Sequence, residues 1–208
     1  MYIPKHYIGK DNNAAVAFMQ RFNFASIITS VNNIPIATHL PFVISKRGDE
    51  IILTSHFARA NNHWEHITEN KNLIIFSEPH AYISPSNYEQ KENVPTWNYL
   101  SVHAYGFAKI IDNESEVTQV LEIMMDSFEP SYKDQWHSLS KEYQTRMSKG
   151  IVAFEIQVSE LQSKEKLSQN KKEGERQSII ASLSNSKAPN KKLIAEYMAL
   201  NEQNSTIK

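Results

Sequence analysis

The stretch Phe24–Ser55, FASIITSVNNIPIATHLPFVISKRGDEIILTS, decides the fold of this chain. Its first part, residues 24–31, is rich in the apolar and β-branched side chains that favour strands. Asn32 and Asn33 then lead into a second apolar segment over residues 34–45. Two Asn between such segments favour a tight hairpin. Connections this short join antiparallel neighbours, because a parallel crossover needs about a dozen residues or more.

The rest of the chain continues in the same manner, with apolar strand-like runs and amphipathic helical stretches. Six strands are predicted, at 24–31, 34–45, 51–55, 72–78, 100–111 and 151–158. Helices are predicted at 12–22, 58–68, 114–128 and 138–149. Gly106 lies inside a predicted strand, where it indicates a bend or bulge. The pattern predicts a mainly β, α+β protein, with an antiparallel sheet or small barrel and helices at its ends.

The composition changes sharply after Leu161. Residues 162–208 are rich in Lys, Ser, Asn and Gln, and Tyr197 is their one aromatic residue. Two short helices are expected there, at about 173–183 and 190–200, separated by a break at 184–189. We therefore expect a main domain over residues 1–160 and a helical C-terminal extension over 161–208, with the last residues disordered.

The overall composition excludes several classes of protein. Net charge is −1 and the pI is about 6.7, without the basic balance of a dedicated nucleic-acid binder. No cysteine is present, so disulfides, thiolate metal sites and thiol nucleophiles are ruled out. No apolar run reaches the ~18 residues that suggest a membrane helix, and the start lacks the apolar region of a signal peptide. These features predict a cytoplasmic protein without a membrane partner.

A second stretch, Ser77–Gly106, is unusually rich in aromatic side chains: SEPHAYISPSNYEQKENVPTWNYLSVHAYG. Tyr and Trp offer flat apolar faces with one polar tip, which suits a planar aromatic ligand. The alternative is a long loop that folds back and buries its own aromatic side chains. The residue chemistry alone leaves these two interpretations open.

Two segments next to predicted strands offer polar contacts for a ligand. Thr38–Phe42 places a His before a Pro, as at an irregular or edge strand, where free backbone groups can bind heteroatoms. Ser55–Asn61 joins a strand to a predicted helix, so its N–H groups and the Arg59 guanidinium can hold a phosphate. The alternatives are a plain edge strand and an ordinary helix cap with an exposed Arg.

Two further clusters have both a functional and a structural interpretation. His63 and His66, three residues apart, can share a helical face and bind a metal; we expect instead that Trp64 is core and the His pair half-exposed. Lys166–Asn170, with Arg176 beyond it, suits recognition of a phosphate or carboxylate, or forms a solvated basic turn. No metal site is predicted, and no catalytic residue can be assigned.

Six motifs together resemble the PaiB family, which is described as FMN-binding negative transcriptional regulators within the flavin-binding split-barrel group. The motifs are MYIPKHY at 1–7, ATHLPF at 37–42, HFARANNHW at 56–64, PHAYISPSNY at 79–88, VPTWNYLSVHAYG at 94–106 and KLSQN at 166–170. The resemblance implies a six-stranded antiparallel split β-barrel that forms a homodimer with FMN at the subunit interface.

The resemblance also implies roles for residues within the matching motifs. Residues 37–42 would run beside the isoalloxazine ring, three side chains would lie near the ribityl phosphate, the aromatic strand would add contacts and the KLSQN motif would line the rim. The implied cofactor-binding residues are Thr38, His39, Leu40, Pro41, His56, Arg59, Asn61, Trp97, Tyr99, His103, Lys166, Gln169 and Asn170.

Three functions fit these expectations. The first is a regulatory FMN-binding protein that represses transcription, directly on DNA or indirectly. We expect no direct sequence-specific DNA binding, because the break at 184–189 is long for a helix-turn-helix and Lys191, Lys192 and Glu196 form a mixed face. The second is a flavin-dependent oxidoreductase of small substrates, with His103 or Tyr99 orienting the substrate. The third is haem binding or degradation through a His ligand.

Overall fold

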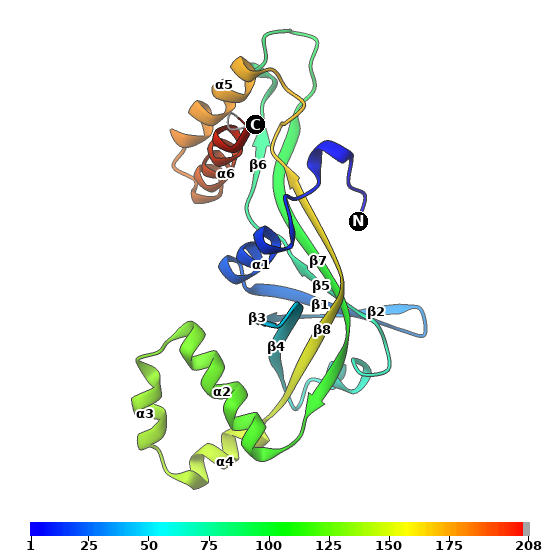
Figure 1. Cartoon of the computed structure of the whole chain (residues 1–208), viewed down its shortest axis with the longest axis vertical. Helices are drawn as coiled ribbons and strands as arrows, with labels where there is room; N and C mark the ends of the chain where they lie inside the picture. The colour runs from blue at the N-terminus through cyan, green and yellow to red at the C-terminus, as the bar shows by residue number, and fades with distance from the viewer. Residues whose placement is uncertain (206–208) are drawn as a thin grey trace. The chain divides into compact units, whose positions relative to one another are not determined.

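The computed structural model describes residues 1–205. Within them the chain forms an eight-stranded, mainly antiparallel sheet with flanking helices, ordered β2-β1-β5-β7-β8-β4-β3, and β6 pairs with β7 (Figure 1). The strands are β1 Phe24–Val31, β2 Ile34–Pro41, β3 Val43–Arg47, β4 Glu50–Ala58, β5 Asn72–Phe76, β6 His80–Ile83, β7 Thr96–Ile111 and β8 Ile151–Lys166. The helices are α1 Asn12–Arg21, α2 Glu114–Phe128, α3 Tyr132–Ser138, α4 Lys141–Lys149, α5 Glu173–Ser184 and α6 Pro189–Ser205, with short 3₁₀ turns η1 Lys5–Tyr7, η2 Asn62–His66 and η3 Pro85–Asn87.

The mainly β class is confirmed, but the described residues form eight strands where six were expected. One extra strand arises because the predicted run 34–45 is divided at Pro41 and Phe42 into β2 and β3. Pro has no N–H with which to continue a ladder, so the strand ends there. The other is β6, which pairs with the first residues of β7.

The chain divides into two compact units, each made of separate segments. Unit 1 comprises Met1–Asp11, Ser77–Val102 and the chain from Gln162 onward, and unit 2 comprises Asn12–Phe76 and His103–Leu161. The long strands β7 and β8 contribute residues to both units. The expected boundary between residues 160 and 161 stays a prediction. The expected disorder of the last residues falls partly on 206–208, which lie outside the described residues.

Unit 2 holds the first hairpins and the largest aromatic core. Asn32 and Asn33 have φ angles of 51° and 66°, as the tight turn between β1 and β2 requires. Four fully buried Phe rings form the centre of the core, with centroid distances between 5.1 and 6.2 Å; they are Phe42, Phe57, Phe76 and Phe154. Edge-to-face and stacked rings of this kind add to the stabilisation from buried area.

The helices α2, α3 and α4 follow β7 and precede β8 (Figure 1). Helix α2 occupies residues 114–128 as predicted, because Asn113 caps its first N–H groups and an apolar stripe faces the sheet. Val117, Val120 and Met124 of this stripe are buried, whereas Phe128 is exposed. Helix α3 was not predicted from the sequence, and α4 begins later than expected, at Lys141.

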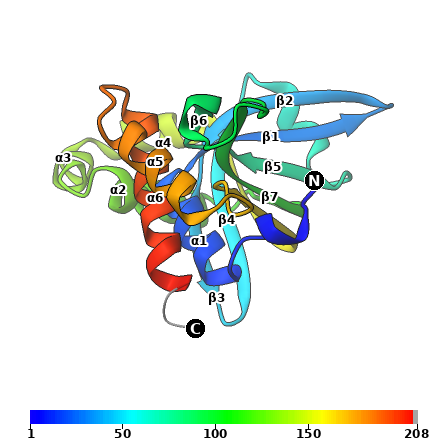
Figure 2. The ribbon, with the colours of Figure 1, turned by 90° about the horizontal axis from the view of Figure 1, so that it is seen from above.

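Unit 1 consists of the β6–β7 hairpin, the end of β8 and the two C-terminal helices. Helices α5 and α6 lie side by side beside β6 (Figure 2). They bury Ile179, Leu183, Ile194 and Met198. Among the described residues, no helix is long and apolar enough to cross a membrane.

Gly106 permits a close approach of two strands within unit 2. Strand β7 runs from Thr96 to Ile111 with Gly106 inside it, and the expected bend or bulge at this position stays a prediction. A Cβ at position 106 would lie about 2.6 Å from Ile156 Cγ2 and closer still to the carbonyl oxygen of Gln157. The backbone of β8 therefore occupies the space that a side chain would need.

We expect Gly106→Ala to lower the Tm and to cost about 1–3 kcal/mol, because the added methyl group must push β8 away. Thermal unfolding monitored by circular dichroism measures the effect. Gly174→Ala is the matched control, since its Cβ would meet no atom closer than 3.7 Å. A Gly106→Ala protein as stable as the control would contradict the close-approach explanation.

Candidate functional site

The predicted cofactor residues fall into two groups, one in each unit. Unit 2 carries the predicted residues of β2 and β4, the two that follow β4 in the chain, and His103 of β7. Unit 1 carries the remaining predicted residues. The unit 2 residues are Thr38, His39, Leu40, Pro41, His56, Arg59, Asn61 and His103, and the unit 1 residues are Trp97, Tyr99, Lys166, Gln169 and Asn170.

A chain of hydrogen bonds through His63 connects the first two flavin-motif segments of unit 2. Asn61 Nδ2 donates to Thr38 Oγ1 at 3.2 Å, and Thr38 Oγ1 lies 2.8 Å from His63 Nδ1. On the other side of the ring, His63 Nε2 lies 2.9 Å from Thr29 Oγ1, which donates to Asn72 Oδ1 at 2.6 Å. His63, Thr29 and Asn72 are at most 3% exposed.

The donors and acceptors of this chain fix the tautomer of His63. The Asn72 amide nitrogen donates to the backbone carbonyls of Ile67, Asn70 and Gly106, so its Oδ1 must accept from Thr29. Thr29 then accepts from His63 Nε2–H, which leaves Nδ1 free of a proton to accept from Thr38. Burial, with a smaller contribution from His66, lowers the pKa of His63 and favours this neutral ring.

His63 was expected at a half-exposed surface, and that expectation is wrong. Trp64 is half-buried and His63 is in the core. The expected helix 58–68 is also wrong, because β4 continues to Ala58 and only the 3₁₀ turn η2 follows. The phosphate cradle built on a helix N-terminus is therefore absent from this segment of the described chain. No group of three or more potential metal ligands occurs within residues 1–205.

Strand β2 presents its flavin-motif residues at an edge of the sheet. His39 is exposed and its ring stacks on Phe24 with a centroid distance of 6.5 Å. Leu40 is buried, and the Pro41 carbonyl accepts from Ser55 Oγ at 2.7 Å. Thr38 and His39 therefore point to opposite faces, the first into the hydrogen-bonded chain and the second toward solvent.

Arg59 holds three consecutive carbonyl groups where α4 passes into β8. Its backbone N–H donates to the carbonyl oxygen of Gly150, its Nε to that of Lys149 and its Nη2 to that of Ile151, each at 2.8 Å. The Lys149 carbonyl belongs to the last turn of α4, where carbonyls lack helical partners and a cation is favoured. The residue itself is exposed, so the guanidinium is held in place yet open to solvent.

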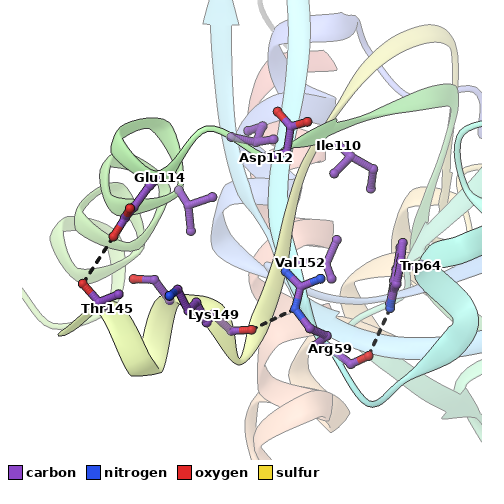
Figure 3. Close-up of a pocket in the computed structure, with 11 residues that line it drawn as sticks. Arg59, Trp64, Ile110, Asp112, Glu114, Thr145, Lys149 and Val152 are labelled. Atoms are coloured by element: carbon purple, nitrogen blue, oxygen red, sulfur yellow. Dashed lines mark hydrogen bonds between the residues drawn. The ribbon is translucent and has the colours of Figure 1, made fainter. Parts of the chain in front are cut away.

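A cavity of about 430 Å³ adjoins Arg59 (Figure 3). Aliphatic side chains and Trp64 supply its apolar walls, and charged side chains from two sides face it. In Figure 3, Arg59 and Lys149 lie at one end and Asp112 at the opposite end. Its lining is Arg59, Trp64, Ile110, Ile111, Asp112, Glu114, Val117, Thr145, Ser148, Lys149 and Val152. Its volume falls in the range of about 300–1,000 Å³ that is usual for ligand sites.

The two remaining His residues of the unit 2 group are half-buried. His56 Nδ1 lies 3.1 Å from Met124 Sδ, and burial lowers the pKa of His56. Burial also lowers the pKa of His103, whose Nδ1 is inaccessible and has no hydrogen-bond partner in the described part of the chain. Both rings are therefore neutral near pH 7, and His103 has an unused nitrogen.

In unit 1 the predicted residues make local contacts. Trp97 is 52% exposed and packs against Tyr82 and His80 with ring centroids 5.8 Å away. The half-buried Tyr99 ring lies 5.1 Å from Lys164 Nζ. The rings of Trp97, Tyr82 and His80 form an exposed cluster on the β6–β7 hairpin.

The KLSQN motif forms a tight turn at the end of β8. Lys166 Nζ donates to Thr96 Oγ1 and to the carbonyl of Trp97. Gln169 bonds within the turn, to the Glu165 carbonyl and the Leu167 N–H. Asn170 Oδ1 accepts from the Tyr7 hydroxyl at 3.0 Å.

The folded protein should lose stability as the pH falls below about 6.5, because burial lowers the pKa of His56, His63 and His103. The unfolded chain then binds more protons than the folded one, so the stabilisation is fully present above the ordinary His pKa and is lost below it. Each such His can contribute a slope of up to about 1.4 kcal/mol per pH unit. Urea unfolding at several pH values measures this slope.

His63→Gln should reduce this slope, because Gln can donate and accept in the same chain without titrating. His137→Gln is the control, since His137 is an exposed residue on α3. If the free energy of unfolding depended equally steeply on pH in the His63→Gln protein and in the wild type, burial of His63 would not contribute to this pH dependence.

Comparisons with known proteins agree with this fold and these motifs. A family model described as "Putative FMN-binding domain" matches residues 1–160. The chain is 39% identical over 202 residues to protease synthase and sporulation protein PAI 2 of Bacillus subtilis, covering 95% of this chain and 96% of that protein. It is also 31% identical over 153 residues to an uncharacterized protein of Saccharomyces cerevisiae, covering 62% of this chain and 90% of the other.

Two solved structures share the fold at low identity. The flavocytochrome Anf3 from Azotobacter vinelandii matches with a TM-score of 0.62 and 15% identity, over 79% of this chain and 72% of that one. The FAD and heme binding protein from Mycobacterium smegmatis matches with a TM-score of 0.58 and 12% identity, over 76% and 72%. The family, the split-barrel class and FMN as its cofactor are confirmed. The chain belongs to the PaiB family of FMN-binding split-barrel proteins.

Proposed function

We propose that this protein is a homodimeric regulator whose state depends on bound FMN, and that it represses its target genes indirectly. The segment Arg59–His63 supplies the central observation. Arg59 is anchored yet exposed, and the hydrogen bonds from Asn61 through Thr38 to His63 hold this segment against β2. Two of the motifs implied in flavin binding are thus fixed relative to each other before a ligand arrives. Such preorganisation reduces the ordering cost of binding.

The donor set of Arg59 fits the FMN phosphate. A guanidinium has five N–H donors, and Nε and Nη2 each use one on a carbonyl, so three remain. Arg is well suited to phosphate because its planar fork can donate two parallel hydrogen bonds. The two carbonyl contacts restrict the rotamers of Arg59, so little further side-chain entropy is lost when a phosphate binds.

The charges around the cavity favour one orientation of the cofactor. A phosphate is attracted to the end with Arg59 and Lys149 and is repelled by Asp112 at the opposite end. The flat, uncharged part of a flavin suits the apolar walls and Trp64. The bound flavin itself would supply redox chemistry, and the chain's residues would bind it, orient it and exclude water.

The regulatory part of the proposal is supported by the relative from Bacillus subtilis, whose name refers to protease synthesis and sporulation and which matches over almost its whole length. Regulation by FMN requires two states of the dimer that bind the flavin with different affinity, since equal affinity shifts no equilibrium. Helix α6 exposes Lys191 and Lys192 together with Glu196 on a mixed face, which favours indirect repression over direct base readout.

FMN titration of the apoprotein, followed by flavin fluorescence, tests the proposal, with riboflavin as the comparison ligand. Arg59→Ala should weaken FMN binding about 10- to 100-fold, because a hydrogen bond to a charged group contributes about 1.5–3 kcal/mol. Riboflavin lacks the phosphate, so its affinity should change little.

The controls separate phosphate binding from the anchoring role of Arg59. Arg59→Gln can keep a bond to the α4 carbonyls while it loses the charge. It should therefore also weaken FMN binding and leave the affinity for riboflavin little changed. Arg47→Ala removes an exposed Arg that pairs with Glu155 and should leave both affinities unchanged. Equal losses for FMN and riboflavin in the Arg59 variants would remove Arg59 from the phosphate site.

Trp97→Ala should weaken both dimerisation and FMN binding. The exposed cluster of Trp97, Tyr82 and His80 provides the apolar aromatic surface that interfaces favour. Size-exclusion chromatography with light scattering measures the dimer, and Phe107→Ala, at another exposed aromatic residue of β7, is the control. A Trp97→Ala dimer of unchanged stability and flavin affinity would contradict this placement.

A flavin-dependent oxidoreductase is the second candidate, and His103 favours it. A neutral imidazole whose Nδ1 has no partner among the described residues could accept a hydrogen bond or a proton from a small substrate, provided that the substrate reaches this buried atom. Bleaching of the bound flavin by NADH or NADPH, with turnover, would support this function. Haem is the further alternative, since the names of two proteins with this fold include a haem or cytochrome function. A Soret band that one His→Ala change abolishes would support it.

A further inference from the structure

Unit 1 contains a second, smaller cavity of about 190 Å³. Its walls come from the N-terminal segment, the connection before β7 and the KLSQN turn. They are formed by Tyr7, Tyr88, Val94, Pro95, Thr96, Lys166, Ser168, Asn170 and Lys171. The volume lies below the ~300 Å³ at which sites for drug-sized ligands begin, so an FMN molecule does not fit in it.

Tyr88 has an unused polar group at this cavity. Its side chain is 92% buried, and its hydroxyl finds no hydrogen-bond partner within residues 1–205. Buried hydroxyls normally have partners, because leaving one unpaired is costly. Burial, then Glu175 and Tyr7, raise the pKa of Tyr88, so the hydroxyl keeps its proton and can donate it.

Two ammonium groups accompany this hydroxyl. Lys171 Nζ lies 3.9 Å from the centroid of the Tyr88 ring and donates to Asn93 Oδ1 at 2.9 Å. Lys166 Nζ donates to Thr96 Oγ1 at 2.5 Å and to the Trp97 carbonyl at 2.6 Å. An ammonium has three donors, so both groups keep at least one for a ligand. Burial, with a smaller contribution from the nearby Lys164, lowers the pKa of Lys166.

The acidic groups nearby are engaged elsewhere. Glu175 accepts from the backbone N–H groups of Glu89 and Lys172, where it caps the start of α5. Glu89 pairs with Lys172 at 2.9 Å. Neither carboxylate lines the cavity. The Tyr88 hydroxyl therefore has no acceptor among the described residues, and no carboxylate in the cavity wall competes for the two ammonium groups.

The walls of the cavity are held by their own hydrogen bonds. Ser168, at a φ of 61°, donates its hydroxyl to the buried Asn98, and its carbonyl accepts from the Lys171 N–H. Tyr7 donates to Asn170 Oδ1 at 3.0 Å, which leaves the Asn170 amide N–H₂ group as a further donor. The donor array is therefore preorganised.

We propose that this cavity binds a compact oxyanion, a phosphate or a small carboxylate, through the Tyr88 hydroxyl and the Lys166 and Lys171 ammonium groups. Lys166 and Asn170 are among the residues that the resemblance implies at the rim of the flavin site, but this cavity is too small for FMN, and the proposal concerns a separate, compact anion. An anion there would satisfy the one buried hydroxyl that the surrounding chain leaves unpaired and would neutralise two lysines. It would also connect the N-terminal segment to the KLSQN turn.

Isothermal titration of the full-length apoprotein with inorganic phosphate, and separately with acetate, tests the proposal at constant ionic strength. We expect saturable 1:1 binding of at least one of these anions, and the comparison distinguishes a phosphate site from a carboxylate site. Tyr88→Phe and Lys171→Met should each weaken that binding about 10-fold or more, as expected for a lost hydrogen bond to a charged group. The anion should raise the Tm of the wild type and raise it less in both variants.

Two controls match these variants. Tyr143→Phe alters a Tyr of α4 in unit 2, and Lys192→Met alters an exposed Lys of α6; both should bind the anion as the wild type does. Without anion, Tyr88→Phe should be at least as stable as the wild type, because it removes an unpaired hydroxyl. A purely structural role for this hydroxyl predicts a lower Tm instead.

The proposal is overturned if the wild type binds neither anion saturably, or if both variants bind it as tightly as the controls. It is also overturned if Tyr88→Phe weakens FMN binding and leaves anion binding unchanged, since the cavity would then serve the flavin. Should Tyr88→Phe not fold, Lys171→Met alone decides, because Lys171 is half-buried and its Nζ contacts are the half-buried Asn93 and the face of the Tyr88 ring.

Discussion

The neutral imidazole of His63 is the constraint on which the organisation of unit 2 depends. It must accept at Nδ1 and donate at Nε2, because the hydrogen-bonding capacity of Asn72 fixes the direction of every bond in the chain. Thr29, Thr38 and Asn72 come from three different strands, so one ring fixes their mutual positions. A buried network of this kind is favourable only when every member is satisfied. Protonation of the ring would force Thr38 to turn its hydroxyl hydrogen away from it.

Local signals in the sequence were sufficient for elements whose determinants are adjacent in the chain. Helix α2 has both its cap, Asn113, and its apolar stripe within one stretch, and its bounds were predicted correctly. The turn at Asn32 and Asn33 is equally local. Pro41 indicated an irregular strand end, and the structure makes it the boundary between β2 and β3.

Features that depend on distant partners could not be predicted in this way. His63 lies in a segment whose composition resembles a helix, and only Thr29 and Thr38, on other strands, show why it is buried. Gly106 is compatible with a bulge and with close packing, and only the position of Gln157 reveals the close packing. The unpaired hydroxyl of Tyr88 is likewise invisible in sequence, because a buried Tyr normally finds a partner. For the cofactor motifs, the segments that contact FMN stay a prediction from the sequence, whereas the carbonyl contacts of Arg59 are seen only in the structure.

The three carbonyl contacts of Arg59 have a consequence for thermodynamic linkage. Helices α2 to α4 leave the sheet after Ile111 and return at Ile151, and Arg59 fastens the point of return. An anion that binds only the remaining N–H donors would strengthen this attachment, and one that draws the guanidinium away from Lys149 and Ile151 would loosen it. Because linkage is reciprocal, the docking of the helical layer would alter anion affinity by the same factor. The helices between β7 and β8 would then form part of the binding equilibrium even where they never touch the ligand.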